Sequence, residues 1–208
     1  MNVNIVKEGE YEFNNFIYIV KNSLDENVCN EIIKLFEASD KTYKGVTQGG
    51  LNENIKNSQD LHMDNDKNVF KDIDKILYDE LNKHLYKYMD IANQNCYTIL
   101  ASKYEDSGFQ IKKYTKNIGF YKYHNDESID HSQDKYRVLT YIWYLNNIEI
   151  GGETEFGGNF KITPEAGKLV IFPCSWTFPH CGLMPIDNDK YIVSGWISCN
   201  LNTPKNGY

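Results

Sequence analysis

The half of the chain that follows Cys96 is a succession of short β-rich runs separated by glycine, asparagine and proline. The runs are rich in β-branched and aromatic residues, which favour strands, whereas the residues between them favour tight turns. The runs are Phe109–Tyr114, Gly119–His124, Arg137–Leu145, Thr154–Phe156, Phe160–Ile162, Leu169–Pro173, Phe178–Gly182 and Tyr191–Cys199. Eight short strands with such turns predict a double-stranded β-helix, or jelly roll.

The N-terminal half has a different pattern, in which apolar residues recur at helical spacing. A short strand is expected over Asn15–Val20, and an amphipathic helix over Asp25–Ala38. Ser23 and Glu26 have the spacing of a capping box before this helix. A second, longer amphipathic helix is expected over Lys67–Ala92. Helices followed by strands predict an α+β fold with N-terminal helices packed on the outside of a jelly-roll core.

The length of 208 residues suits a single domain over 1–208. Its helical support would span about 15–95 and its jelly-roll core about 105–200. Hydrophobic residues make up 41% and charged residues 25% of the chain, enough for a core without disulfide bonds. The segment Asp40–Asn57 has no periodicity, and loops of this length in compact domains are usually functional or mobile.

Composition also excludes several classes of function. The net charge of −7 argues against a nucleic-acid-binding protein, and the basic run Gln110–Lys116 is interpreted as a solvated strand face. The N-terminus lacks the pattern of a signal peptide, and no apolar run is long enough to span a membrane. The five cysteines are irregularly spaced, which favours free thiols and a cytoplasmic location over a zinc site at Cys174, His180 and Cys181.

Two histidine–aspartate pairs have the i, i+2 spacing that places both side chains on one face of a strand. His124 and Asp126 end an expected strand, whereas His62 and Asp64 lie between a loop and a helix with no expected strand around them. His62 is therefore interpreted as a surface residue. A histidine–aspartate pair supplies two ligands of a 2-His-1-carboxylate site for non-haem Fe(II). His180, 56 residues after His124 on a late strand, is the candidate for the third.

Lys190 opens the last expected strand, and lysine is almost never buried without a partner. If its side chain points into the barrel, it requires an anion, such as the far carboxylate of a dicarboxylate bound to the metal. The alternative from this residue alone is an exposed lysine in a turn.

Read together, these residues resemble the 2-oxoglutarate- and Fe(II)-dependent dioxygenases of the prolyl 4-hydroxylase type. The resemblance rests on QIKKYTKNIGFYKYHND, RVLTYIWYLN, GGETEF, ITPEAGKLVIF, PHCG and KYIVSGW, in this order. It extends weakly to KNSQDL at Lys56–Leu61, near the family's substrate entrance. It implies Fe(II), 2-oxoglutarate and O2, with ascorbate as an optional further cofactor. The site residues that it implies are His124, Asp126 and His180 for the metal, Lys190, Tyr114 and Thr154 for 2-oxoglutarate, and Tyr121, Arg137 and Trp196 for the substrate pocket.

The resemblance implies hydroxylation of an unactivated C–H bond, with a prolyl residue of a peptide or protein as the favoured substrate. The intact Asp126 favours hydroxylation over halogenation, since related halogenases leave that ligand position to chloride. Two alternatives stay open: a hydroxylase of a free amino acid, small metabolite or nucleobase, and a non-catalytic jelly-roll binding module. No nucleic-acid partner and no membrane association are expected, and the sequence leaves the oligomeric state open.

Overall fold

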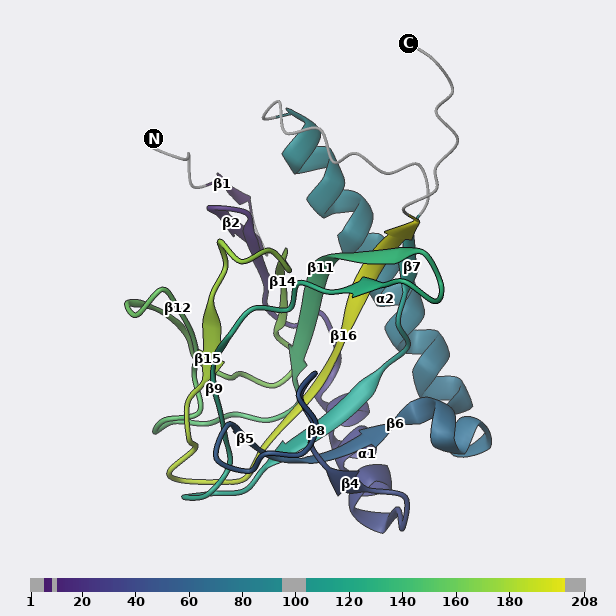
Figure 1. Cartoon of the computed structure of the whole chain (residues 1–208), viewed down its shortest axis with the longest axis vertical. Coiled ribbons are helices and arrows are strands. Elements are labelled where there is room, and N and C mark those ends of the chain that lie inside the picture. The colour runs from purple at the N-terminus through teal and green to yellow at the C-terminus, as the bar shows by residue number, and fades with distance from the viewer. Residues whose placement is uncertain (1–5, 9–10, 95–103, 201–208) are drawn as a thin grey trace.

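The computed structural model describes residues 6–8, 11–94 and 104–200. Within these ranges two antiparallel sheets face each other, and helices lie along the outside of the larger sheet (Figure 1). The helices are α1 (Glu26–Ala38) and α2 (Lys67–Gln94), with a 3₁₀ turn at Met63–Asp66 just before α2.

The larger sheet has the strand order β1-β2-β3-β14-β11-β16-β8-β6-β4, with β10 paired to β11 and β7 paired to β16. Its strands are β1 (Val6–Glu8), β2 (Tyr11–Asn14), β3 (Ile17–Val20), β4 (Tyr43–Lys44), β6 (Gln59–His62), β7 (Tyr104–Asp106), β8 (Gln110–Tyr114), β10 (Ile129–Asp130), β11 (Lys135–Tyr144), β14 (Leu169–Pro173) and β16 (Lys190–Asn200). The smaller sheet has the order β13-β12-β15-β9-β5. Its strands are β5 (Lys56–Asn57), β9 (Phe120–His124), β12 (Thr154–Phe156), β13 (Phe160–Ile162) and β15 (His180–Gly182).

The central strand β11 separates two hydrophobic cores, because successive side chains of a strand point to opposite faces. Tyr141 and Trp143 pack in one cluster with the buried faces of α1 and α2. Ile142 and Tyr144 pack in the other cluster, between the two sheets. The larger sheet is therefore covered by helices on one face and by the smaller sheet on the other. This arrangement confirms the predicted jelly-roll core with helices outside.

The start of α1 differs from the prediction in its cap. Asp25 is the N-cap, and its carboxylate accepts a hydrogen bond from the backbone N–H of Asn27 at 2.8 Å. The Ser23 hydroxyl accepts instead from the indole N–H of Trp143 at 3.0 Å. The predicted capping box of Ser23 and Glu26 is therefore wrong, because the serine side chain is engaged with the sheet.

The eight expected strands all form, and their ends differ from the expectation by at most two residues. Short edge strands were missed, since segments such as β4 and β5 are too short for a periodic pattern. Most of the predicted Asp40–Asn57 loop lies outside regular structure, between β4 and β5. Of the five cysteines, Cys29, Cys174, Cys181 and Cys199 are free thiols, and Cys96 lies outside the described residues. None of the described helices is long and apolar enough to cross a membrane.

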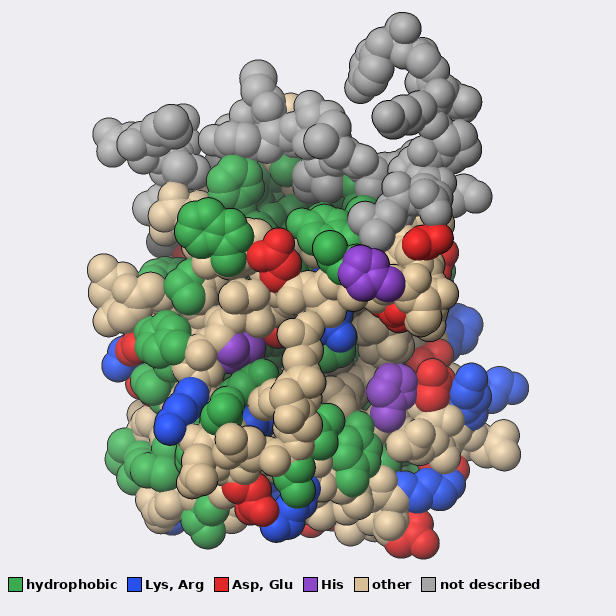
Figure 2. All heavy atoms as spheres, in the orientation of Figure 1, with side chains coloured by type: hydrophobic (Ala, Val, Ile, Leu, Met, Phe, Trp, Pro, Cys, Tyr) green, Lys and Arg blue, Asp and Glu red, His purple; other side chains and the backbone are tan. Residues whose placement is uncertain are grey.

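The molecular surface carries charges of both signs. On the face shown in Figure 2, acidic and basic side chains are interspersed, and hydrophobic side chains reach the surface between them. The exposed hydrophobic residues of the β4–β5 loop are Val46, Leu51 and Ile55.

Candidate active site

The pairing of β9 with β15 places three candidate metal ligands together. His180 lies directly opposite His124 in this ladder, and Asp126 follows β9 by two residues. One ligand atom from each of the three side chains lies within 4.8 Å of the others. The Nε2 atom of His124 is 3.7 Å from one carboxylate oxygen of Asp126, and the Nε2 atom of His180 is 3.6 Å from the other. Metal–ligand distances of about 2.0–2.2 Å fit between atoms at this spacing.

The two imidazole rings are oriented by the backbone. The Nδ1 atom of His124 lies 2.8 Å from the carbonyl oxygen of Lys122, and that of His180 lies 3.1 Å from the carbonyl oxygen of Phe178. A ring that donates from Nδ1 leaves the Nε2 lone pair free to bind a metal. Burial, and then the neighbouring His180, lower the pKa of His124 to about 4, so that this ring is neutral at pH 7.

Thr140 fixes the carboxylate of Asp126 and was not identified from the sequence. Its hydroxyl donates a hydrogen bond of 2.7 Å to Asp126. Burial alone would raise the pKa of the Asp126 carboxyl, yet the two histidines and this hydroxyl lower it below its ordinary value. The carboxylate is thus ionised at neutral pH, and the three side chains form a donor set suited to Fe(II).

A cavity of about 540 Å³ is lined by these three side chains and by the six other residues that the resemblance implies for the site. The residues that line it include His124, Asp126, His180, Tyr114, Tyr121, Arg137, Thr154, Lys190 and Trp196. Part of its wall is the loop before β5, through residues such as Val46, Gln48 and Ile55. No described residue of the segment Glu127–Lys135, which follows Asp126 and includes β10, lines it.

Lys190 lies inside the barrel, with only 2% of its surface exposed. Its ammonium group donates a 2.7 Å hydrogen bond to the carbonyl of Gly152, a residue with the positive φ of 72° that glycine tolerates. Burial lowers the pKa of Lys190 to about 8, although the carboxylate of Glu153 opposes the shift. No ion pair neutralises Lys190 in the described part of the chain. The alternative of an exposed turn lysine is therefore wrong.

Tyr114 and Thr154, the other two residues that the resemblance implies for 2-oxoglutarate, line the same cavity as Lys190. Tyr114 pairs with Lys190 across β8 and β16, and its ring centroid is 4.7 Å from the Lys190 nitrogen. Burial raises the pKa of Tyr114 well above its ordinary value, which keeps its hydroxyl protonated as a hydrogen-bond donor. The buried Thr154 accepts a 2.6 Å hydrogen bond from Tyr144. Both residues line the cavity, and their role in binding 2-oxoglutarate stays a prediction.

The three candidates for substrate contacts are aromatic or cationic side chains. Tyr121 stacks on the His124 ring with 3.5 Å between the ring centroids. The guanidinium group of Arg137 lies 3.7 Å from the centroid of the Trp196 ring. These three residues line the same cavity, and their contact with substrate stays a prediction.

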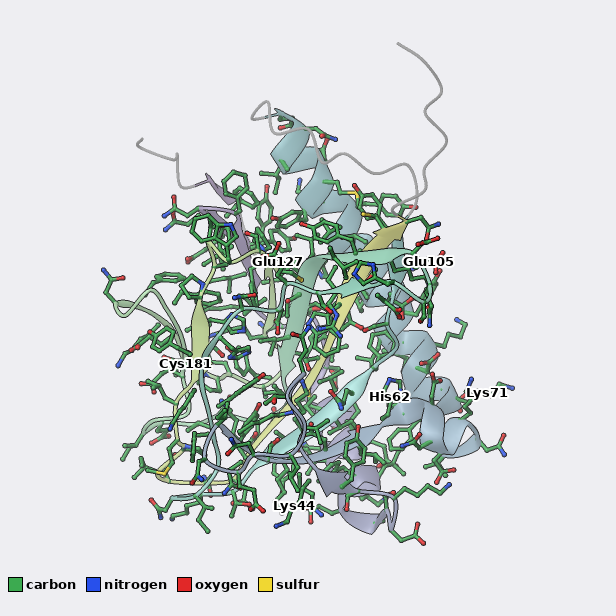
Figure 3. All side chains as sticks on the ribbon, viewed as in Figure 1. Lys44, His62, Lys71, Glu105, Glu127 and Cys181 are labelled. Atoms are coloured by element: carbon green, nitrogen blue, oxygen red, sulfur yellow. The ribbon has the colours of Figure 1, made fainter. Side chains whose placement is uncertain are left out.

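His62 lies outside the ligand group, but its surroundings differ from the prediction. It ends strand β6, which pairs with β8 and places His62 opposite Gln110. Its Nδ1 atom accepts from the backbone N–H of Asp64 at 3.4 Å. In Figure 3 it lies near the start of α2, on the other side of the view from Cys181 of β15. The expectation that no paired strand surrounds His62 is therefore wrong.

The basic run Gln110–Lys116 also differs from its interpretation as a solvated face. Lys113 does face outward, where it contacts the carboxylate of Glu37 at 2.8 Å. Lys112 points the other way because side chains alternate along β8, and only 7% of its surface is exposed. It lines the cavity that contains the metal ligands.

The KNSQDL segment contributes a buried ion pair to the wall of the cavity. The ammonium group of Lys56 lies 2.6 Å from the carboxylate of Asp60, which also accepts a 2.7 Å hydrogen bond from Ser58. The Lys56 and Asp60 side chains are 4% and 0% exposed. The segment therefore supports the wall through charges that satisfy each other.

We expect Asp60→Asn to destabilise the fold by about 3–5 kcal/mol, because it leaves the Lys56 charge buried without a partner. Urea unfolding of the variant measures this loss. The double variant Lys56→Met/Asp60→Leu removes both charges and should recover most of the stability. A single variant as stable as the parent protein would contradict the assignment of this pair as a buried, mutually dependent contact.

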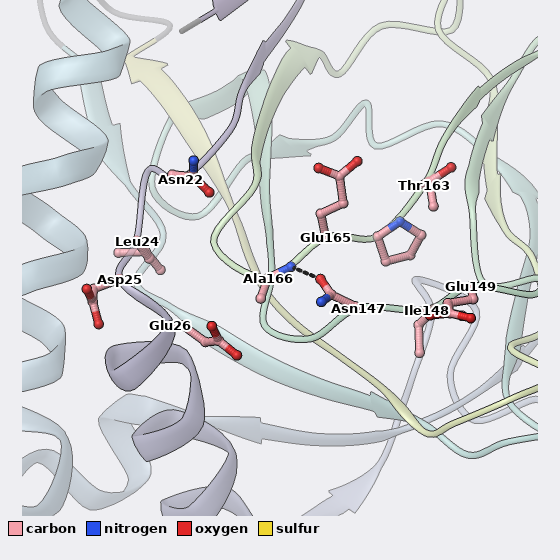
Figure 4. A pocket seen from close by; sticks show the side chains of 11 residues that line it. Asn22, Leu24, Asp25, Glu26, Asn147, Ile148, Glu149, Thr163, Glu165 and Ala166 are labelled. Carbon is pink, nitrogen blue, oxygen red and sulfur yellow. Dashed lines mark hydrogen bonds between the residues drawn. The ribbon is translucent and has the colours of Figure 1, made fainter.

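A second hollow, of about 720 Å³, lies beside the N-terminus of α1 (Figure 4). Its lining is acidic and polar, with Asp25, Glu26, Glu149 and Glu165 around a hydrogen bond from the Ala166 N–H to Asn147. It contains none of the candidate side chains, so the chemistry is assigned to the smaller cavity.

Comparison with known sequences agrees with this assignment. Residues 109–198 match the sequence model of the 2OG-Fe(II) oxygenase superfamily, and this range includes all three candidate ligands and Lys190. These residues form a 2OG-Fe(II) oxygenase domain. The oxygenase domain confirms the predicted 2-oxoglutarate- and Fe(II)-dependent dioxygenase, and it implies Fe(II), 2-oxoglutarate and O2. A comparison with curated proteins found no match.

Solved structures similar to this chain share its fold at low sequence identity. A viral collagen prolyl hydroxylase from Paramecium bursaria Chlorella virus-1, in complex with 2OG, has a TM-score of 0.64 and 20% identity, over 89% of this chain and 97% of that one. A prolyl-4-hydroxylase of Pseudomonas putida has a TM-score of 0.62 and 18% identity, over 87% and 91%. A prolyl hydroxylase of Trichoplax adhaerens, in complex with a hypoxia inducible factor peptide fragment, has 0.62 and 19%, over 88% and 84%.

Proposed function

We propose that this oxygenase domain hydroxylates a prolyl residue in a peptide or protein. The observation that carries the proposal is one cavity with two ends: the ligand group of His124, Asp126 and His180, and the buried, unneutralised Lys190. The similar structures of a collagen prolyl hydroxylase and of a prolyl hydroxylase with a bound peptide support the prolyl substrate. The cavity wall formed by the loop before β5 supports an extended substrate.

The residues of the cavity have separate roles: some bind the metal or 2-oxoglutarate, and others orient the substrate. His124, Asp126 and His180 would hold Fe(II), which together with 2-oxoglutarate supplies the oxidising power for attack on an unactivated C–H bond. Lys190 binds the far carboxylate of 2-oxoglutarate by a charge-assisted hydrogen bond. Tyr114 donates a second hydrogen bond, and Thr154 assists. Tyr121, Arg137 and Trp196 orient the substrate against the metal end of the cavity.

The test is an anaerobic titration of the metal-free protein with Fe(II) and 2-oxoglutarate, followed by aerobic incubation with proline-containing peptides. We expect a visible charge-transfer band on titration and a gain of one oxygen atom on proline, measured by mass spectrometry. Iron binding without the band would contradict the assignment of 2-oxoglutarate. A band together with oxidation of free amino acids but of no peptide would favour the small-molecule hydroxylase instead.

Two further expectations belong to this proposal. The free thiols support a location in the reducing cytoplasm, which fractionation of cells that express the protein can test. Ascorbate is proposed as an optional reductant. Without it, the initial rate of peptide oxidation should be unchanged, but oxidation should stop earlier.

A further inference from the structure

Lys112 is a buried cation that the proposed mechanism does not use. It is 7% exposed, lines the cavity and lies between Asp60 of β6 and Ile192 of β16 in the cross-strand register. Within the described part of the chain its ammonium group makes no hydrogen bond and no ion pair. The ammonium group instead lies over the Trp196 ring, with 5.4 Å between the nitrogen and the ring centroid.

The carboxylates near Lys112 are engaged elsewhere. Asp60 is held by Lys56 at 2.6 Å and by Ser58 at 2.7 Å. Asp126 faces the two histidines and accepts from Thr140. The cost of this position is visible in the pKa of Lys112, which burial and then the nearby Lys56 lower to about 8, with Asp60 and Asp126 opposing and Arg137 adding to the shift.

A second cation shares the same aromatic ring. The guanidinium group of Arg137 lies 3.7 Å from the Trp196 ring centroid, and it too makes no ion pair with any described residue. Other polar groups of this wall are also unsatisfied, since the Ser194 hydroxyl and the Trp196 indole nitrogen are buried without a hydrogen-bond partner. Two unpaired cations and unsatisfied polar groups thus line one part of a cavity in a protein with a net charge of −7.

The cosubstrate does not account for these charges. In the proposed function Lys190 binds the far carboxylate of 2-oxoglutarate, and it pairs with Tyr114 at the end of β8. Lys112 is the next residue of β8 whose side chain points into the cavity. An anion that contacts Lys112 and Arg137 is therefore a second one. Cations that are buried without a partner are stabilised by a ligand that brings the opposite charge.

We propose that Lys112 and Arg137, placed around Trp196, bind a carboxylate of the substrate. The inference rests on the proposed function, which it extends from a prolyl substrate to an acidic one. The carboxylate has two possible sources: an acidic side chain near the target residue in a peptide, or the α-carboxylate of a free amino acid. Lys112 would then determine specificity, since an amide of the same shape leaves its charge without a partner.

The test is calorimetric titration of the protein loaded with Mn(II), a redox-inert substitute for iron, and 2-oxoglutarate. The peptide probes are pentapeptides with blocked ends that contain one proline and one glutamate, and the glutamate occupies a different position in each peptide. The other probes are the same peptides with glutamine in place of glutamate, free L-proline and L-prolinamide. We expect one acid to bind on the order of tenfold to a hundredfold more tightly than its matched amide. A preference among the peptides assigns the side-chain source, and a preference for free proline assigns the α-carboxylate.

Lys112→Met should reduce this preference to less than about twofold, whereas Lys71→Met should retain it. Lys71 is exposed on α2 and projects from the molecule in Figure 3, so its loss changes the net charge equally without touching the cavity. Lys112→Met should also raise the thermal midpoint, because it removes an unpaired buried charge. A lower midpoint would assign Lys112 a structural role and overturn the proposal.

The remaining outcomes separate the two proposals. Equal binding of acids and amides overturns the proposed carboxylate site. If the glutamate and glutamine peptides are then both hydroxylated, the proposed prolyl hydroxylase function is still supported. Preferential binding of free proline, without oxidation of any peptide, supports the carboxylate site and contradicts the peptide substrate. A preference that survives in Lys112→Met also overturns the assignment.

Discussion

Replacing Asp126 by asparagine is expected to lower the affinity for Fe(II) by more than about a hundredfold, since loss of an outer-shell partner alone typically costs ten- to a hundredfold. Asp126 is the one carboxylate in the ligand group, and its oxygens lie 3.7 and 3.6 Å from the two histidine nitrogens. Asparagine keeps the size of the side chain and an oxygen that accepts from Thr140, but it removes the negative charge that balances the dication. Peptide oxidation and 2-oxoglutarate consumption should fall together.

The matched control is Asp130→Asn, which removes the same charge from an exposed position four residues further along. It should retain iron binding and turnover. Calorimetry with Fe(II) under anaerobic conditions measures the affinity, and thermal unfolding of the metal-free variants shows that both are folded. If Asp126→Asn binds Fe(II) as tightly as the parent protein, the three side chains are not the iron site, however close they lie.

The sequence predicted the strands that carry a periodic or β-rich pattern and missed the ones that do not. Successive side chains of β11 pack in two different cores, so the strand is apolar along a continuous run of residues and its sequence predicts a buried strand. β6, by contrast, holds the charged and polar residues Gln59, Asp60 and His62, and its burial depends on pairing with β8. Strand propensity is decided by such neighbours, which a local pattern does not contain.

The site divides in the same way. His124, Asp126 and His180 could be predicted because a strand fixes the i, i+2 spacing and the chemistry demands those residue types. Thr140 and Lys112 could not, because a threonine in a strand and a lysine in a basic run each have an ordinary explanation. The run KK at Lys112 and Lys113 places one cation outside, against Glu37, and one inside. Recognition of the inward one requires the register of β8 against β16.

Lys190→Met is expected to have opposite effects on stability and on cosubstrate binding. Burial lowers the pKa of Lys190 from 10.5 to about 8, which corresponds to a cost of about 3 kcal/mol for the charged form. Below pH 8 the lysine is protonated in both the folded and the unfolded protein, so this cost is fully present. It is relieved as the pH rises from about 8 towards 10.5. Without ligands, Lys190→Met should therefore unfold roughly 5–10 °C higher than the parent protein at pH 7.

The same substitution should abolish the response to 2-oxoglutarate. A ligand that binds only the folded state stabilises it by about 2.7 kcal/mol at a hundredfold excess over Kd, so the parent protein loaded with Mn(II) should unfold at a higher temperature when 2-oxoglutarate is added. Lys190→Met should show no such rise, whereas Lys168→Met, which changes a buried lysine outside the cavity, should keep it. In the parent protein the affinity for 2-oxoglutarate should weaken as the pH rises through about 8, because neutral Lys190 no longer offers a charge-assisted hydrogen bond. A thermal response to 2-oxoglutarate that persists in Lys190→Met would place the far carboxylate elsewhere in the cavity. Lys112 would then be the cation to test in its place.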